Sequence, residues 1–255
     1  MKQRYRIDIE YDGTNYHGWQ RQKAQPGQPE LETVQKAIEQ AIESYAQERV
    51  SLVAAGRTDA GVHALQQVAH FDLGKARSGI EIAAALNFYL CAAGHRIAVL
   101  KAQPVSAEFS ARFSAKKRHY LYRIIQRRAP LVLQANRAWH VPRDLNVPLM
   151  QLAAQLLVGT HDFSSFRAAE CQAKSPVRTI DSIEITRRSE GLIEMRVVAQ
   201  SFLHNQIRAF MGSLYNVGIT RWTSEDLAQA LAAKSRACAG QNAPPCGLYL
   251  KKIEY

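Results

Sequence analysis

The chain has 255 residues, enough for one large domain or two modest ones, and its apolar fraction of 47% argues against global disorder. Lys and Arg number 33 against 22 Asp and Glu, so the net charge of +11 favours a polyanionic partner, with a merely basic enzyme as the alternative. No apolar run approaches the ~18 residues of a membrane span, and the start lacks the apolar core of a signal peptide, so we expect a cytoplasmic protein without a membrane partner.

The first half of the chain predicts the order β-α-β-β-α-β, which defines a ferredoxin-like unit. Alternating apolar residues indicate strands, and apolar residues at helical spacing indicate helices. The expected elements are a strand over 4–11, a helix over 31–45, strands over 50–55 and 66–73, a helix over 80–91 and a strand over 96–105.

The second half varies the same plan, so we predict an α+β fold of two ferredoxin-like halves with mainly antiparallel sheets. Pro104 and a polar stretch interrupt the pattern near residues 104–116, so we divide the chain into the domains 1–105 and 106–255. The expected elements are a strand over 119–127, a helix over 147–159 ending at Gly159, an antiparallel pair over 178–188 and 192–201 joined by Ser-Glu-Gly, a helix over 203–217, a helix over 224–233 capped by Ser224, and a strand over 247–255.

The segment from Phe109 to Arg143 holds nine Lys and Arg and no acidic residue. Aromatic residues are interleaved with these cations, among them Phe113, Tyr120, Tyr122 and Trp139. Cations that meet phosphates beside rings that meet bases are typical of single-stranded or distorted RNA recognition. A solvated basic face over a strand is the alternative interpretation.

The stretch "AAGRTDAGVHA" (54–64) places Arg57 and Asp59 between Gly56 and Gly61, directly after an apolar run. This layout is compatible with a turn or with a site. Arg208, in an otherwise apolar helix, requires a carboxylate partner, and Asp59 is the isolated candidate. A structural salt bridge is the alternative to a catalytic pair.

Metal and cofactor motifs do not stand out in the sequence. The four cysteines form no Cys-x-x-Cys pair, and the eight histidines show no ligand spacing, so we expect no metal site.

Six motifs occur in one order over nearly the whole chain and resemble the tRNA pseudouridine synthase A family. They are "EYDGTNYHGWQRQ", "GRTDAGVHA", "ARFSAKKRHYLYRI", "DFSSFRA", "FLHNQIRAFMGSL" and "CGLYL". Asn205-Gln206 stands where His-Met is commoner in the family, while the arginine that follows is retained. The resemblance implies a pseudouridine-synthase-type catalytic core around a basic cleft.

The resemblance implies isomerisation of uridine to pseudouridine at positions 38, 39 and/or 40 of the tRNA anticodon arm, by a homodimer and without a cofactor. The reaction breaks the N1–C1′ bond, turns the uracil and rejoins it through C5. Asp59 is the expected essential carboxylate, whether it adds to C1′, adds to C6 or assists elimination.

The resemblance also implies roles for other residues. Arg208 would orient Asp59 and keep it ionised, and Tyr120 would stack on the uracil and relay a proton. Arg57 would fill the gap that the flipped-out uridine leaves in the RNA helix, or grip the phosphate. Leu248 would form an apolar wall beside the base. The basic residues expected to contact the substrate are Lys116, Arg118 and Arg21.

Two other functions are compatible with parts of the sequence. An RNA-binding module without chemistry would explain the basic segment, but it would gain nothing from a carboxylate that repels phosphate. A hydrolase using Asp59 and His63 would need a second carboxylate or a metal-ligand set nearby.

Overall fold

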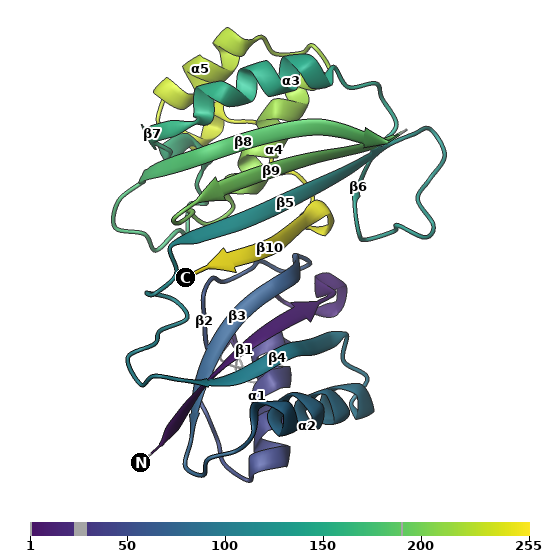
Figure 1. The fold of residues 1–255 in the computed structure, drawn as a ribbon. Helices are drawn as coiled ribbons and strands as arrows, with labels where there is room; N and C mark the ends of the chain where they lie inside the picture. The colour runs from purple at the N-terminus through teal and green to yellow at the C-terminus, as the bar shows by residue number, and fades with distance from the viewer. Residues whose placement is uncertain (1, 23–29, 190) are drawn as a thin grey trace. The chain divides into compact units, whose positions relative to one another are not determined.

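The computed structural model describes residues 2–22, 30–189 and 191–255, which fold as two compact units. Unit 1 runs to Lys116 and includes Tyr249–Tyr255, and unit 2 is Lys117–Leu248. Figure 1 shows each unit as a sheet with helices packed against it. The domain division after residue 105 stays a prediction, while the compact units divide the chain after Lys116.

Unit 1 contains the element order that the alternating and helical patterns predict. The elements are β1 (Gln3–Tyr11), α1 (Val34–Ala46), β2 (Val53–Ala54), β3 (His63–Leu73), α2 (Gly79–Ala92) and β4 (Ile97–Val105). Strands β4, β1 and β3 are antiparallel neighbours in that order, and β2 also pairs with β3. The C-terminal strand β10 (Leu248–Glu254) runs parallel to β3. Helices α1 and α2 cover the same face of this sheet (Figure 1).

Helix α1 begins three residues later than the sequence predicts, and its N-cap explains the difference. The Thr33 hydroxyl accepts a hydrogen bond from the backbone N–H of Lys36 at 3.3 Å, so the helix begins at Val34. Leu31 therefore precedes the cap and is exposed, while Ile38 and Ile42 are fully buried against the sheet.

Unit 2 is a second antiparallel sheet, in the order β5-β9-β8-β7, with the short β6 parallel to β5. Its elements are β5 (Lys117–Gln126), β6 (Trp139–Val141), α3 (Val147–Ala154), β7 (Gly159–Asp162), β8 (Val177–Ser189), β9 (Leu192–Ala199), α4 (Gln206–Gly218) and α5 (Ser224–Ala232). Helices α3, α4 and α5 lie on one face of that sheet (Figure 1). The α+β class with mainly antiparallel sheets is therefore confirmed.

Three element boundaries in unit 2 correct the sequence-based expectations. Helix α3 ends at Ala154 and gives way to a short 3-10 turn, and Gly159 begins β7 instead of ending a helix. Helix α4 begins at Gln206 because Asn205 has φ 62°, a left-handed conformation that does not continue a helix. The N-cap of α5 is Thr223, not Ser224.

The remaining helical segments are single 3-10 turns: Gly13–Asn15, Gln155–Leu157, Ser164–Phe166, Arg236–Cys238 and Pro245–Gly247. The expected turn over 189–191 includes Glu190, which lies outside the described residues. None of the helices in the described ranges is long and apolar enough to cross a membrane.

Candidate active site

The loop that carries Asp59 connects β2 to β3 and is hydrogen-bonded at both ends. Before the loop, the Ala55 N–H donates to the Val68 carbonyl at 2.8 Å, and the Gln67 side chain donates to the Gly56 carbonyl at 2.7 Å. At its far end, the Val62 N–H donates back to the Asp59 carbonyl at 3.1 Å. These bonds fix the backbone on either side of the aspartate.

The N-terminal segment Tyr11–Trp19 holds the same loop from the other side. The Trp19 N–H donates to the Thr58 carbonyl at 3.0 Å, and the Gly61 N–H donates to the Tyr16 carbonyl at 3.3 Å. The hydroxyls of Tyr11 and Thr58 also share a hydrogen bond of 2.8 Å. Two motifs far apart in the sequence therefore form one structural feature.

Two glycines allow this close approach of backbone to backbone. A Cβ at Gly13 would lie 2.0 Å from the Val62 carbonyl oxygen, which is far inside van der Waals contact. A Cβ at Gly18 would lie 2.7 Å from the Thr58 carbonyl oxygen, and Gly18 also has φ +88°. The glycines of the opening motif are thus required by the aspartate loop.

His63, immediately after the loop, is a buried structural partner. Its side chain stacks on Tyr249 at 4.7 Å, and its Nδ1 accepts the Gly13 N–H at 3.0 Å. Only 2% of His63 is exposed, which disfavours the hydrolase interpretation because a general base must reach the substrate.

Asp12 also helps to hold the N-terminal segment in place, through a carboxylate that stays ionised. Burial by itself would raise the pKa of Asp12, but hydrogen bonds from Thr14 and Arg96 outweigh it and lower the pKa to about 2. The Arg96 guanidinium donates to this carboxylate at 2.9 Å. Asp12 therefore stays charged at neutral pH and ties the N-terminal segment to the start of β4.

Some side chains of the loop are buried and anchor it, and others are accessible to solvent. Thr58 and Val62 are buried, Asp59 is half-buried, and Arg57 is exposed. The loop thus presents a cation and a carboxylate from a backbone that is fixed underneath.

The other predicted catalytic residues belong to unit 2. Tyr120 lies on β5, is 8% exposed, and meets the Phe202 ring edge-on at a centroid distance of 5.1 Å. Arg208 lies in the first turn of α4, where its Nε donates to the Ala243 carbonyl at 2.8 Å and its Nη1 donates to the Asn205 side-chain oxygen at 2.9 Å.

The residue pair Asn205-Gln206 helps to position Arg208. Asn205 binds the guanidinium directly. The buried Gln206 accepts the Leu203 N–H at 2.8 Å and so fixes the chain just before α4. Asn205-Gln206 thus supplies local hydrogen bonds at the start of the helix that carries Arg208.

Tyr122, expected from the sequence only as one of the aromatic residues of the basic segment, has a structural role in this region. Its hydroxyl donates to the Pro244 carbonyl at 2.7 Å, and burial raises its pKa well above the ordinary value. A Cβ at Gly247 would lie 2.7 Å from the Tyr122 ring. Tyr122 therefore fixes the chain next to Leu248, which is itself buried. The alternation Tyr120-Leu121-Tyr122 is the signal that puts both tyrosines on one face of β5.

The three expected basic contacts differ in their surroundings. Lys116 is exposed, and its N–H donates to the Glu254 carbonyl at 2.7 Å. The Arg118 side chain donates to the Gln200 carbonyl. Arg21 pairs with Glu30 at 2.7 Å and Glu39 at 3.6 Å, so two carboxylates offset its charge.

Unit 1 brings Arg57 and Asp59 together in one loop, and unit 2 contains Tyr120, Arg208 and Leu248. The catalytic grouping of residues from both units stays a prediction.

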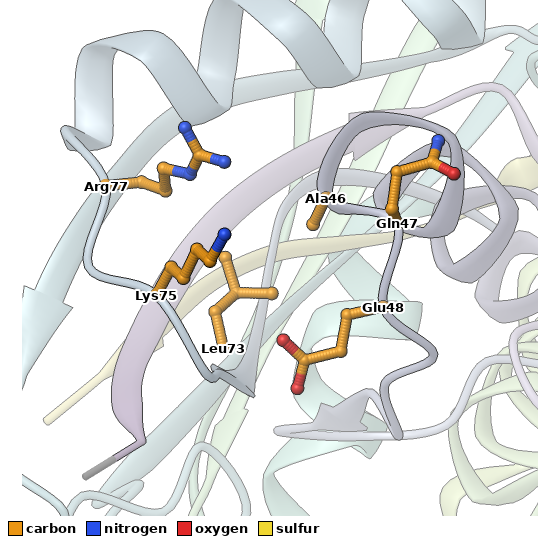
Figure 2. Close-up of a pocket in the computed structure, with 6 residues that line it drawn as sticks. All are labelled: Ala46, Gln47, Glu48, Leu73, Lys75 and Arg77. Atoms are coloured by element: carbon orange, nitrogen blue, oxygen red, sulfur yellow. The ribbon is translucent and has the colours of Figure 1, made fainter.

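A hollow of about 330 Å³ lies elsewhere in unit 1, between the end of α1 and the segment after β3. Figure 2 shows Lys75 and Arg77 on one side of it and Gln47 and Glu48 on the other. Glu48 accepts the Gly74 N–H at 2.8 Å, and none of the predicted catalytic residues lines the hollow. We therefore assign it no part in the chemistry.

Comparison with known proteins gives the family of this α+β chain with its anchored Arg-x-Asp loop. The family model described as "tRNA pseudouridine synthase" matches residues 8–114 and 153–255, and the chain belongs to that family. It is 53% identical to tRNA pseudouridine synthase A of Rhizobium meliloti (strain 1021), over 99% of both chains. It is 54% identical to the protein of that name from Sinorhizobium fredii, again over 99% of both chains, and 52% identical to that of Brucella ovis, over 99% of this chain and 98% of the relative.

Proposed function

We propose that this protein converts uridine to pseudouridine in tRNA, at positions 38, 39 and/or 40 of the anticodon arm. Family membership and the names of relatives more than half identical support the reaction class. The site is proposed to need no cofactor, and the enzyme to act as a homodimer in the cytoplasm, where its tRNA substrate is found.

The observation that carries the proposal is the anchored aspartate loop. Backbone hydrogen bonds from Trp19 and to Tyr16 hold residues 58 and 61, and two glycines permit that approach. A carboxylate on a pre-fixed backbone suits a reaction in which a flipped-out nucleotide must meet one oxygen in one geometry.

The reaction is an isomerisation, so its atoms balance without a co-reactant. The N1–C1′ bond breaks with its electron pair leaving on the uracil, the base turns, and C5 forms the new bond to C1′. The proton on C5 is lost, and a proton is gained at N1. Asp59 serves as nucleophile at C1′, as nucleophile at C6, or as the carboxylate that assists elimination, and all three require its ionised form.

In this proposal the neighbouring side chains act on the carboxylate and the base. Arg208, oriented by Asn205 and the Ala243 carbonyl, pairs with Asp59 and keeps it ionised. Tyr120 stacks on the uracil and relays the C5 proton, and Leu248 forms an apolar wall. The exposed Arg57 grips the phosphate of the flipped nucleotide or fills the gap that it leaves.

Lys116, Arg118 and Arg21 are proposed to bind tRNA phosphates at the rim of a basic cleft. Lys116 is exposed within the acid-free segment and is expected to contribute the most. Arg21 is expected to contribute the least, because Glu30 and Glu39 already offset its charge.

The proposal is tested with tRNA transcripts labelled with tritium at uracil C5. Formation of the C5–C1′ bond releases the label, so we expect release from a transcript with U38, U39 and U40. Transcripts with each uridine replaced singly will show which positions react. Release that persists when all three are replaced would contradict the proposed positions, and no release from any folded, tRNA-binding preparation would contradict the proposed reaction.

The homodimer is tested separately by sedimentation equilibrium. We expect a mass twice the 28.6 kDa of the chain. A monomer at the concentration that supports full activity would contradict it.

A further inference from the structure

The acid-free segment contains five aromatic residues, Phe109, Phe113, Tyr120, Tyr122 and Trp139, and one of them differs from the rest in exposure. Phe109 is half-buried. Tyr120 is 8% exposed and Tyr122 is fully buried. Trp139 packs on Tyr215 at a centroid distance of 4.8 Å. Phe113, in contrast, is 82% exposed. Only this ring is almost fully open to solvent.

Phe113 stands on a turn that is tightly fixed. The Ser114 N–H donates to the Ser110 carbonyl at 2.9 Å, and the Ser110 N–H donates to the Ser114 hydroxyl oxygen at 3.1 Å. The Ser110 hydroxyl oxygen also accepts the Phe113 N–H at 3.3 Å. The backbone under the exposed ring is therefore ordered by its own turn.

The turn is also anchored to the rest of unit 1. The Ala111 N–H donates to His70 at 3.1 Å, and the Ala111 carbonyl accepts the hydroxyl of Tyr255 at 2.8 Å. Ala111 is fully buried and Ala115 is 6% exposed, so the residues on either side of Phe113 hold the turn in the core. The conformational entropy of this turn is lost on folding, before any partner binds.

The surroundings of the ring are basic. The Arg112 guanidinium lies 5.4 Å from the centroid of the Phe113 ring. Lys116 and Lys117, three and four residues after Phe113, are exposed, and no acid occurs from residue 109 to 143. A large apolar ring kept in water on an ordered basic turn contributes little to folding, and its face is available for stacking beside these cations.

We infer that Phe113 stacks on an unpaired base of the tRNA, with Arg112 and Lys116 meeting the adjoining phosphates. A ring beside cations is the arrangement that single-stranded RNA requires, because every base has a face to stack on and every nucleotide has a charge. The inference rests on the proposed function, since it takes tRNA as the ligand. It adds a base contact outside the residues already assigned to the reaction.

The first test compares the affinity of the unchanged chain and four variants for an unmodified tRNA transcript at fixed salt. We expect Phe113→Ala and Phe113→Leu to raise Kd about five- to hundredfold, and Phe113→Trp to stay within about threefold of the unchanged chain. Phe88→Ala is the matched control, because Phe88 is also exposed, at 67%, but lies on α2 beside Ile80 and Ala84 without a basic turn. It is expected to bind normally.

The second test detects the stacking itself. A tryptophan placed by Phe113→Trp should lose fluorescence on addition of the transcript, whereas one placed by Phe88→Trp should not. Phe113→Ala should also leave the slope of log Kd against log salt unchanged, because no charge is removed. Circular dichroism and thermal melting confirm that each exposed-site variant is folded.

Three results would overturn the inference. They are unchanged affinity in Phe113→Ala, full affinity in Phe113→Leu, which supplies apolar area without a ring, and dissociation of a homodimer by Phe113→Ala with tRNA binding retained. In each case the unchanged chain would still bind and modify tRNA, so the proposed function would stand. Failure of the unchanged chain to bind tRNA would instead contradict the proposed function.

Discussion

The aspartate loop depends on residues that contribute no chemistry of their own. Gly18 has φ +88° and lies where a Cβ would meet the Thr58 carbonyl oxygen at 2.7 Å. The sequence places this glycine in a polar turn region, but it does not show which part of the chain packs against that turn. Its role depends on a contact with a residue forty positions later, which local pattern does not encode.

Gly18→Ala is therefore expected to destabilise the protein by about 2–5 kcal/mol, combining backbone strain with displacement of the loop. Gly94→Ala is the matched control, because Gly94 has φ +74° but nothing within 4 Å of its Cβ position. The control should cost only about 1–2 kcal/mol and keep full activity. Urea unfolding and tritium release at a temperature where both are folded measure this, and equal effects of the two variants would contradict the account.

His70 makes stability depend on pH. Burial, and secondarily the charge of Arg4, lowers its pKa below the ordinary value, despite the opposing charge of Asp72. The unfolded chain therefore binds a proton more readily than the folded one. The contribution of His70 to stability is fully present above about pH 6.5, and it is lost as the pH decreases through the folded-state pKa.

His70→Gln should lower stability at neutral pH but flatten its decline in acid, because the replacement does not titrate. Urea unfolding of both proteins at about pH 7.5 and pH 5.5 measures the difference. An identical loss of stability in the two proteins on acidification would show that His70 is not the group responsible.

Among the elements, the long and strongly periodic ones were predictable and the short ones were not. The alternation in β1 and the antiparallel pair β8 and β9 are visible in the sequence because one face of each is apolar. Strand β6 has three residues and β7 has four, and each exists because a neighbouring strand offers it backbone partners. Sequence periodicity over so few residues contains no such information.

The start of α5 gives a test at the level of one element. Thr223 accepts the Asp226 N–H at 3.2 Å and its own N–H donates to the Asp226 carboxylate at 2.7 Å, which forms a capping box. Thr223→Ala is expected to cost about 1 kcal/mol and Ser224→Ala to cost much less. Chemical denaturation measures the two effects. A larger effect of Ser224→Ala would contradict Thr223 as the N-cap and support Ser224, the cap expected from the sequence.

For the whole molecule, the net charge of +11 predicts that tRNA binding weakens steeply with salt. Lys116→Gln should reduce the slope of log K against log salt by about 1, since it removes one phosphate contact. Lys75→Gln, beside the hollow of Figure 2, is the charge-matched control and should leave the slope unchanged. A reduced slope in the control alone would place the phosphate-binding surface elsewhere.

The organisation of the chain into units was only partly visible in the sequence. Pro104 and a polar stretch indicate an interruption near residues 104–116, and the compact units divide after Lys116. The reason is that Tyr255 and Glu254 at the end of the chain hydrogen-bond to Ala111 and Lys116. Such contacts between the connector and the C-terminus leave no sequence pattern.

The central claim is that Asp59 carries the reaction, and Asp59→Asn tests it most directly. This change keeps the size of the side chain and removes its charge. With C5-tritiated tRNA we expect release by the unchanged protein and a loss of at least about 10³-fold by Asp59→Asn, with tRNA binding retained. Tritium release by a folded Asp59→Asn protein at a rate near that of the unchanged protein would contradict the account.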